Sequence, residues 1–446
     1  MIARADRLVD ANPLLKGSPY VGYVYSYPHK TAYRPLDPPV ALGPLWAGER
    51  RDSLFLYLHI PFCGMRCGYC NLFTRAKPAE AQVSGYLDAM RRQAARVRSA
   101  IPDATFARFA MGGGTPTYLG LSELESALDV AERTMGADLS QIPGSVEVSP
   151  GTADVEKLGL LRERGIDRIS IGIETFDEAE AAAVSRPQKT TAVERALETI
   201  KRSGAPTLNI DLIYGLPGQS VASWLRSIRA ALRFAPEELY LYPLYVRPLT
   251  ALGRSQREWD DLRLACYREA RDLLRAEGYA QVSMRMFRAP HAPEDRGPVY
   301  RCQEDGMIGL GCGARSYTSG LHHGSEYAVG GRSIRAILDD YIARPDHAFD
   351  LADFGCSLGE DDRRRRYVIQ SLLSGEGLDR LGYLTRFGTD PLDDLPELAD
   401  LPGLGLAVDA ADRLALTDAG LERSDAIGPW LYSDRVRRLM EEYAWR

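Results

Sequence analysis

The sequence predicts an α/β fold built around an open, partial barrel. Short β-rich apolar segments alternate with longer amphipathic segments from Leu54 to Tyr245. The short segments are apolar throughout rather than strictly alternating, which is typical of parallel strands that are buried on both faces. Repeated strand–helix units favour a parallel sheet with right-handed crossovers. Six such units favour an incomplete barrel over a closed eight-fold one.

Each unit of this partial (β/α)6 TIM-like barrel can be read from the chain. The six predicted strands are Leu54–Ile60, Phe106–Met111, Ser145–Val148, Arg168–Glu174, Thr207–Ile213 and Leu239–Tyr245. The clearest helical stretches between them are Ala79–Ala100, Leu121–Met135 and Ala192–Ser203. Polar motifs follow the carboxyl ends of these strands, which is where α/β barrels build their sites.

The regions around the barrel differ from it in composition and periodicity. We predict an irregular N-terminal segment at 1–50, the barrel at 51–250, an extension on the substrate side at 251–360, and a small C-terminal domain at 361–446. Residues 1–50 are rich in Pro, Gly and Tyr. A helix is expected at Trp259–Glu277. The C-terminal domain is expected to be helical or winged-helix-like, because residues 414–421 resemble a hairpin that enters a helix. Arg363–Arg366 is expected to begin a solvated helix.

The composition is that of an ordinary globular protein and limits the possible partners. The chain has 446 residues, 45% apolar and 26% charged, with a net charge of −6. This balance argues against nucleic acid or a membrane surface as the main partner. No apolar run is long enough to span a bilayer, and the first residues lack the apolar core of a signal peptide. Seven cysteines in so long a chain suit a reducing compartment, so we expect a cytoplasmic protein.

Three cysteines follow the first predicted strand. Cys63, Cys67 and Cys70 have the spacing C-x3-C-x2-C. Three thiolates can hold three corners of a cubane iron–sulfur cluster and leave one iron without a protein ligand. That iron can bind a small molecule, whereas a fourth cysteine would make the cluster a closed electron carrier. Tyr69 adds a flat apolar face. The spacing therefore predicts a [4Fe-4S] cluster that does chemistry.

A zinc site, a set of disulfides and plain core packing all fit the triplet less well. Zinc sites usually have two C-x2-C pairs or histidines at a set spacing, and only His59 is near. An odd triplet within eight residues cannot pair off into disulfides. Scattered core thiols would not gather so tightly in the sequence.

Four further motifs lie at the carboxyl ends of later strands. Gly112–Pro116, with the sequence GGGTP, follows the second strand, Glu147 ends the third, Glu174 ends the fourth and Asp211 lies at the fifth. Each is weak alone, but their shared place at one end of one sheet predicts a single site.

Together these residues resemble the oxygen-independent coproporphyrinogen III oxidase-like (HemN-like) branch of the radical S-adenosylmethionine (radical SAM) superfamily. The motifs that carry the resemblance are Tyr57–Cys63, Gly112–Pro116, Arg168–Glu174, Asn209–Pro217 and Gly309–Ala314. The resemblance covers residues 50–320 best. It implies a cluster bound by Cys63, Cys67 and Cys70, and a radical made by reductive cleavage of SAM, which then abstracts hydrogen from an organic substrate.

The resemblance also implies which residues bind SAM. Gly112, Gly113, Thr115, Glu147 and Arg186 would hold the methionyl part. The remaining predicted contacts are Glu174 and Asp211 with the ribose, Tyr69 and Ile213 with the adenine, and Tyr57 near the sulfonium. Simpler roles are open for each residue: a tight turn for the glycines, a structural ion pair between Arg186 and Glu147 or Glu174, and plain core packing for Tyr69 and Ile213.

The sequence specifies the substrate less closely than it specifies the cluster and SAM. Coproporphyrinogen oxidases have a further cysteine just after the triplet, where this chain has Asn71–Phe73. The segment Tyr242–Arg247 looks more like the tailoring enzymes and methyltransferases of the branch, so we expect a tailoring enzyme of secondary metabolism. Candidate substrate contacts are Tyr242, Tyr245, Arg247 and Arg315. The alternatives are a methyltransferase that uses a second SAM, a haem chaperone, a coproporphyrinogen III dehydrogenase, and a structural or regulatory protein with a vestigial cluster.

The sequence also allows predictions about binding partners and about the four remaining cysteines. The implied partners are a small organic substrate and a one-electron donor such as flavodoxin or ferredoxin. Cys266, Cys302, Cys312 and Cys356 could bind an auxiliary cluster or donate sulfur, but their wide spacing favours scattered free thiols. His322–His323 is expected in a loop near the substrate entrance.

Overall fold

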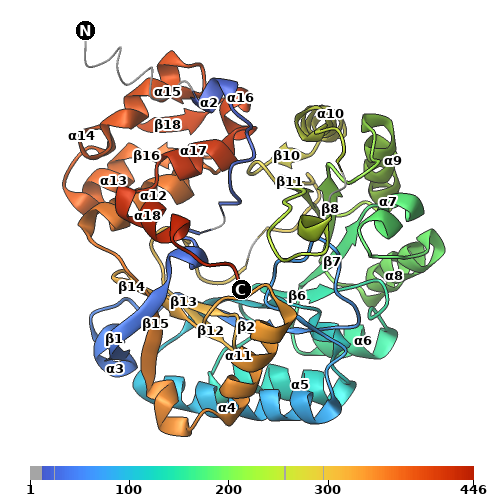
Figure 1. Cartoon of the computed structure of the whole chain (residues 1–446), viewed down its shortest axis with the longest axis vertical. Helices are drawn as coiled ribbons and strands as arrows, with labels where there is room; N and C mark the ends of the chain where they lie inside the picture. The colour runs from blue at the N-terminus through green and yellow to red at the C-terminus, as the bar shows by residue number, and fades with distance from the viewer. Residues whose placement is uncertain (1–12, 25, 256–257, 295) are drawn as a thin grey trace.

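The computed structural model describes residues 13–24, 26–255, 258–294 and 296–446, and it contains one large mixed sheet. The centre of that sheet is parallel. In spatial order the parallel strands are β12 (Met307–Leu310), β2 (Leu54–Ile60), β5 (Phe106–Gly113), β6 (Gly144–Val148), β7 (Arg168–Glu174), β8 (Thr207–Tyr214) and β9 (Glu238–Pro243). Six of them are the predicted barrel strands, so the α/β partial-barrel prediction is confirmed (Figure 1).

Antiparallel strands extend the sheet at both edges. Beyond β12 lie β13 (Arg315–Tyr317), β14 (Leu321–Gly324), β15 (Leu351–Ser357) and β1 (Arg34–Ala41), and beyond β9 lie β11 (Met286–Arg288) and β10 (Ala280–Gln281). Two expectations were therefore wrong. The segment 1–50 contains a paired strand, and His322–His323 lies on β14. Pro35, Pro38 and Pro39 hid β1 in the sequence, since proline in a strand is tolerated only at an edge or a bulge.

Helices cover the outer, convex side of the parallel strands (Figure 1). They are α4 (Glu80–Ala100), α5 (Leu121–Asp129), α6 (Val155–Glu163), α7 (Glu178–Ala183), α8 (Thr190–Ser203), α9 (Val221–Leu232) and α10 (Arg263–Ala276). Local signals set their ends: Ser220 caps α9 by accepting from the Ser223 amide, and α8 ends at Gly204 in the left-handed conformation. The helix expected at 259–277 begins four residues later, at Arg263.

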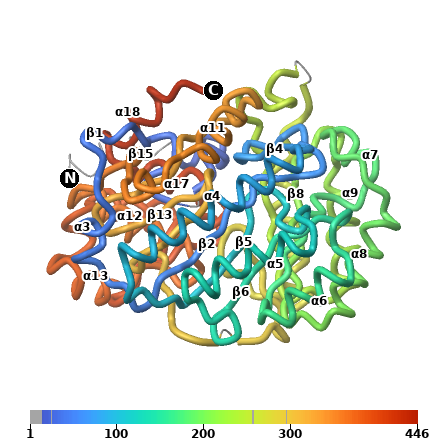
Figure 2. The backbone as a smooth tube through the Cα atoms, turned by 90° about the horizontal axis from the view of Figure 1, so that it is seen from below, coloured from blue at the N-terminus to red at the C-terminus, as the bar shows by residue number. Residues whose placement is uncertain are grey.

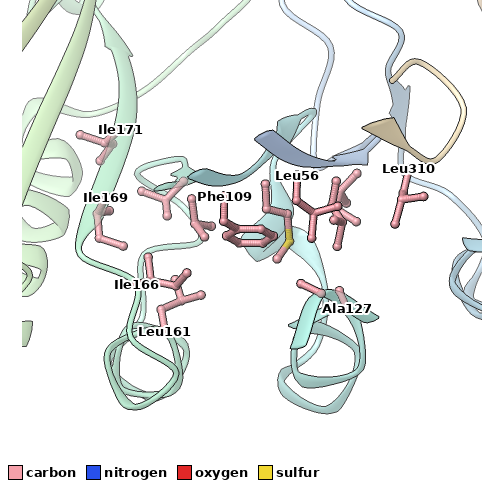
Figure 3. Close-up of a cluster of buried hydrophobic side chains, with 14 of the residues drawn as sticks. Leu56, Phe109, Ala127, Leu161, Ile166, Ile169, Ile171 and Leu310 are labelled. Carbon is pink, nitrogen blue, oxygen red and sulfur yellow. The ribbon is translucent and has the colours of Figure 1, made fainter. Parts of the chain in front are cut away.

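The main core lies between these helices and the strands. Figure 3 shows Leu56 of β2, Phe109 of β5 and Ile169 of β7 beside Ala127 of α5 and Leu161 of α6. All five are at most 2% exposed. Burial of strand side chains on this scale explains why the strands read as continuous apolar runs.

The C-terminal region has a core of its own. It contains the following elements: α12 (Glu360–Leu372), β16 (Leu378–Asp379), α13 (Arg380–Phe387), α14 (Pro391–Asp394), α15 (Asp400–Gly403), β17 (Ala407–Asp409), β18 (Arg413–Leu416), α16 (Asp418–Leu421), α17 (Ser424–Trp430) and α18 (Asp434–Glu441). The 414–421 motif lies on β18, the second strand of the β17–β18 hairpin, and on α16. Arg363–Arg366 lies on α12 as expected, but Arg366 is buried, so the expectation of a solvated run was wrong there.

Residues 20–24 and 26–34, which we call the strap, run between the C-terminal region and the barrel (Figure 1). Tyr20 lies edge-on to Tyr214 of β8, and the Gly22 amide donates to the Asp425 carbonyl. Tyr27 donates to Asp362 of α12. The strap therefore contacts both parts of the molecule.

The rest of the chain closes the edges of the structure. It consists of α2 (Pro13–Lys16), η1 (Lys30–Ala32), α3 (Leu42–Ala47), β3 (Phe62–Cys63), β4 (Arg75–Ala76), η2 (Pro116–Tyr118), η3 (Val130–Thr134), η4 (Leu252–Arg254), α11 (Gly331–Ala343), η5 (Asp346–Asp350) and η6 (Pro396–Ala399). Figures 1 and 2 both place the C-terminal residues beside α11, where the Arg446 carbonyl accepts from the Val329 and Gly330 amides. Among the described residues, none of the helices has the length and apolarity needed to cross a bilayer.

Candidate active site

The three cysteines lie on one loop at the carboxyl end of β2. Cys63 ends β3, and its carbonyl accepts from the Lys77 amide at 2.9 Å. The Gly68 amide donates to the Val184 carbonyl at 2.8 Å, and the Gly68 carbonyl accepts from Leu252. All three thiols are free and line the same cavity of about 650 Å³, which we call the first cavity. The loop thus brings the triplet to one space.

Each cysteine sulfur has a polar neighbour. Arg186 Nη1 lies 3.1 Å from Cys67 Sγ, Thr115 Oγ1 lies 3.7 Å from Cys63 Sγ, and Thr74 Oγ1 lies 3.5 Å from Cys70 Sγ. A guanidinium and hydroxyl donors of this kind favour thiolates. Burial raises the pKa of the Cys63 thiol to about 12, so that ligand would ionise only on binding metal.

The donor set suits a multi-iron cluster better than a single ion. Within the part of the chain that the structure describes, no three His, Cys, Asp or Glu side chains are grouped as ligands of one metal ion. In a cubane cluster each thiolate binds a different iron, so the sulfurs share a cavity without converging on one point. The residues present therefore fit the cluster, and a zinc site has no support.

The GGGTP loop packs directly against the cysteine loop. The Gly114 and Thr115 amides donate to the Ile60 and Phe62 carbonyls at 2.7 and 2.8 Å. Gly113 has φ +107°, and a Cβ there would overlap the His59 ring. A Cβ on Gly112 would lie 2.6 Å from Glu147 Oε1. Close approach of neighbouring side chains therefore favours glycine at both positions, and the backbone conformation adds to this at Gly113.

Three carboxylates surround the first cavity. Glu147 of β6, Glu174 of β7 and Asp211 of β8 come from the carboxyl halves of consecutive strands. Glu147 accepts from the Gly113 amide at 3.0 Å, and Asp211 accepts from the Asn209 amide group at 2.8 Å. Glu174 adopts φ +68°, a left-handed conformation that side chains other than glycine seldom take.

The enclosure of these groups alters their pKa values. Although Glu147 is accessible, it opens onto interior cavities, and removal from bulk water raises its pKa. Burial likewise raises the pKa of Glu174, against the opposing effect of Arg186, whose Nη2 lies 3.8 Å away. Burial raises the pKa of Asp211 to about 7, with the Asn209 hydrogen bond opposing it and the charge of Glu174 adding to it. The first cavity is therefore lined by more acidic than basic side chains.

The predicted adenine contacts share one apolar cluster. Ile213 is 7% exposed and belongs to a small cluster against which Tyr69 and Tyr242 pack. Tyr69 and Tyr242 also line the first cavity. Tyr57 lies elsewhere: its hydroxyl is 3.3 Å from His59 Nδ1, and it lines a neighbouring cavity.

That neighbouring space, which we call the second cavity, has a volume of about 380 Å³. It shares Leu72, Gly113 and Glu147 with the first cavity, so the two adjoin. Its other walls include Lys30 of the strap and Arg315 of β13. Molecules bound in the two cavities would therefore meet near Glu147.

The four predicted substrate contacts are divided by the structure. Tyr242 lines the first cavity and Arg315 the second. Tyr245 donates to Asp425 of α17 at 2.5 Å, and the Arg247 guanidinium lies 5.2 Å from the Tyr245 ring centroid. This places Tyr245 against the C-terminal region, and the proposed substrate roles of all four stay predictions.

Sequence reasoning missed residues of the strap and of α12. Tyr23 lines the first cavity, and Lys30 and Arg366 line the second. The aromatic composition of residues 20–33 was a signal that this segment packs. Nothing local in it indicates which cavity it reaches.

Comparison with known proteins agrees with this site. Residues 57–231 match the family described as the Radical SAM superfamily. The oxygen-independent coproporphyrinogen III oxidase of Cereibacter sphaeroides is 27% identical over 80% of this chain and 83% of its own length. The heme chaperone HemW of Bacillus subtilis is 29% identical over 59% of this chain and 71% of its own length.

A solved structure shows the same fold. The coproporphyrinogen III oxidase HemN of Escherichia coli superposes with a TM-score of 0.79 at 23% identity, over 92% of this chain and 96% of that one. The cysteine loop and the match over residues 57–231 make the chain similar to the radical SAM superfamily. The relatives that it matches over most of its length liken it to the HemN-like branch of that superfamily.

Proposed function

We propose that this chain uses a [4Fe-4S] cluster on Cys63, Cys67 and Cys70 to cleave SAM and to abstract hydrogen from an organic substrate. The observation that carries the proposal is the first cavity, which brings together the cysteine loop, the GGGTP loop and the ends of β6, β7 and β8. The family implies the cluster and SAM. When bound, they supply a 5′-deoxyadenosyl radical made with one electron from an external donor.

The charge of the first cavity supports a cationic ligand. Glu147, Glu174 and Asp211 face one enclosed space, and the Arg186 guanidinium lies beside Glu174. SAM carries two positive centres, an ammonium and a sulfonium, and one carboxylate. Three acidic groups with one guanidinium complement that pattern, because enclosed charges are strongly stabilised by opposite charges.

We assign the residues as follows. Glu147 and the Gly112–Gly113 backbone would hold the methionyl ammonium, and Arg186 the methionyl carboxylate in a charge-assisted bond. The remaining assignments are Thr115 beside the methionyl part, Glu174 and Asp211 on the ribose hydroxyls, Tyr69 and Ile213 on the adenine, and Tyr57 facing the second cavity. Tyr242, which also packs against the Ile213 cluster, would add to the adenine wall.

The names of the matched relatives narrow the choice of substrate and reaction. Those matched are named for coproporphyrinogen III oxidation and for haem chaperoning. Neither name supports the tailoring role expected from the sequence, nor a second SAM. A second candidate is therefore a tetrapyrrole function, either oxidation or carriage. Phe55, Tyr57 and Tyr300, which line the second cavity, would suit a flat ring system.

The test is an anaerobic assay of the reconstituted protein. We expect about four iron and four sulfide per chain if a cubane forms, and 5′-deoxyadenosine after reduction with SAM present. Protein that binds iron and sulfide yet forms no 5′-deoxyadenosine would overturn the proposal. Titration with haem, and incubation with coproporphyrinogen III, then separate the tetrapyrrole candidates by absorbance change and by product.

A further inference from the structure

The second cavity gathers cationic side chains from three distant segments. Lys30 comes from the strap, Arg315 from β13 and Arg366 from α12 of the C-terminal region. They share this space with aromatic side chains and with two acids, Glu147 and Glu326. Burial, and next the charge of Arg315, lower the pKa of Lys30 well below its ordinary value, so a bound anion would favour the ammonium form of this side chain.

The two acids of the cavity are not paired with Lys30 or Arg366. Glu326 forms its ion pair with Arg446, and Glu147 accepts from the Gly113 amide. With the residues that the structure describes, Lys30 and Arg366 form no ion pair. Arg366 donates instead to the Gln303 and Cys302 carbonyls, and its Nε is buried without a partner.

The position of Lys30 is fixed by aromatic packing. Its Nζ lies 3.7 Å from the centroid of the Tyr327 ring, a cation–π contact. The Tyr327 hydroxyl donates to the Asn71 carbonyl at 2.7 Å, one residue after Cys70. Arg66 also donates to the Val329 carbonyl. The wall that holds Lys30 is therefore tied to the cysteine loop.

From these contacts we infer that Lys30, Arg315 and Arg366 bind an acidic group, a carboxylate or a phosphate, on the substrate. The claim that the bound molecule is a substrate rests on the proposed function. The anion site itself does not depend on SAM cleavage. An acid group held here would place the rest of the substrate toward Glu147, which both cavities share. Charge-assisted bonds from an ammonium and two guanidinium groups suit either anion.

The test measures binding of two small probe anions by calorimetry. Tricarballylate represents carboxylates and inorganic pyrophosphate represents phosphates; the neutral triamide of tricarballylate is the uncharged comparison. We expect the full-length protein to bind at least one anion, to ignore the triamide, and to bind less tightly as ionic strength rises. The anion that binds more tightly identifies the acid group. Equal binding of the triamide would overturn the inference.

Variants locate the site. Lys30→Met and Arg366→Met should each raise the Kd of the preferred anion by about tenfold or more, the loss expected for one charge-assisted bond. Lys30→Arg should retain binding. The matched control is Arg229→Met, because Arg229 is exposed on α9, away from both cavities. If Lys30→Met binds the anion as tightly as the parent protein, the assignment is wrong, whatever Arg366→Met does.

One further variant separates this inference from the proposed function. Cys67→Ala should bind the probe anion with unchanged Kd, since the cysteine is not part of the second cavity. Absence of SAM cleavage with anion binding intact would count against the proposed function alone. SAM cleavage with no charge-dependent anion binding would count against the anion site alone.

Discussion

The two adjoining cavities are opposite in charge and differ in how the chain builds them. The first is acidic, and its carboxylates come from the ends of β6, β7 and β8 in one parallel sheet. The second is basic, and its cations come from the strap, β13 and α12. Neighbouring strands of the parallel sheet thus line the first cavity, where we propose that the cofactor binds. Packing between distant segments brings together the basic side chains of the second cavity, where we propose that the substrate binds. The first should depend on local residues and the second on docking of the C-terminal region.

The largest loss of activity is expected when a cysteine that binds the cluster is removed from the first cavity. Cys67→Ala should abolish cluster loading and 5′-deoxyadenosine formation, because two cysteines cannot hold a cubane stably. The measurement is iron and sulfide content together with the anaerobic cleavage assay. Cys356→Ala is the control, since Cys356 is buried in the C-terminal core on β15. Retained cleavage by Cys67→Ala would show that the ligand assignment is wrong.

The next effect should fall on the contact between α17 of the C-terminal region and the rest of the molecule, which we call the seam. Asp425 of α17 forms a buried ion pair with Arg285 and accepts from Tyr245 and from the Val24 amide. Asp425→Asn leaves Arg285 buried without its counter-charge, which costs about 3–5 kcal/mol in comparable pairs. Urea denaturation should therefore show a lowered free energy of unfolding.

Asp434→Asn is the control for the seam, because Asp434 is exposed at the start of α18. The contrast between the two cavities adds a second expectation for the Asp425 variant. Asp425→Asn should weaken probe-anion binding more than it weakens SAM cleavage. Equal loss of both would show that the first cavity also depends on the C-terminal region.

A smaller effect should come from the GGGTP loop. Gly113→Ala forces a side chain into φ +107° and into the His59 ring, and such backbone strain costs about 1–3 kcal/mol. We expect SAM affinity to fall by roughly tenfold to a hundredfold at constant iron content. Gly151 lines the same cavity, but a Cβ there would meet nothing within 4 Å, so Gly151→Ala is the matched control. Equal affinities of the two variants would contradict the role of close packing.

The two cavities also differ in how much of their structure the sequence predicts. The strands of the first cavity were readable because burial on both faces makes them apolar, and their polar ends mark one edge of the sheet. By contrast, β12 is four residues long and flanked by glycines, and its pairing with β2 is long-range. Short, glycine-bearing segments carry little periodicity, so this strand was not predicted.

The second cavity was not predictable from the sequence for a related reason. Lys30 and Arg366 are far apart in the chain, and neither carries a local pattern that shows where it packs. The run Arg363–Arg366 looked like a solvated face, but only Arg363 is exposed; Arg364 and Arg365 are half-buried and Arg366 is buried. Contacts between distant segments depend on tertiary packing, which single-sequence patterns do not record.

The smallest predicted effect is a pH dependence of the acidic cavity. Burial raises the pKa of Asp211 to about 7, above its ordinary value. Between the two values the folded protein holds a proton that the unfolded chain has lost, so the free energy of unfolding should fall as pH rises through that interval. A cationic ligand favours the ionised carboxylate, so SAM binding should tighten by up to about tenfold per pH unit from about 6 to 7 and release protons.

Calorimetry in buffers of different ionisation enthalpy measures that proton release. Asp211→Asn keeps the size of the side chain and cannot ionise, so both its stability and its SAM affinity should lose this part of the pH dependence while iron content is kept. Asp211→Ala should raise the SAM concentration needed for cleavage more than it lowers iron content. If iron content collapses instead, Asp211 supports the cluster loop rather than the ligand. If SAM affinity keeps its full pH dependence in Asp211→Asn, Glu147 or Glu174 is the titrating group, since both have raised pKa values in the same cavity.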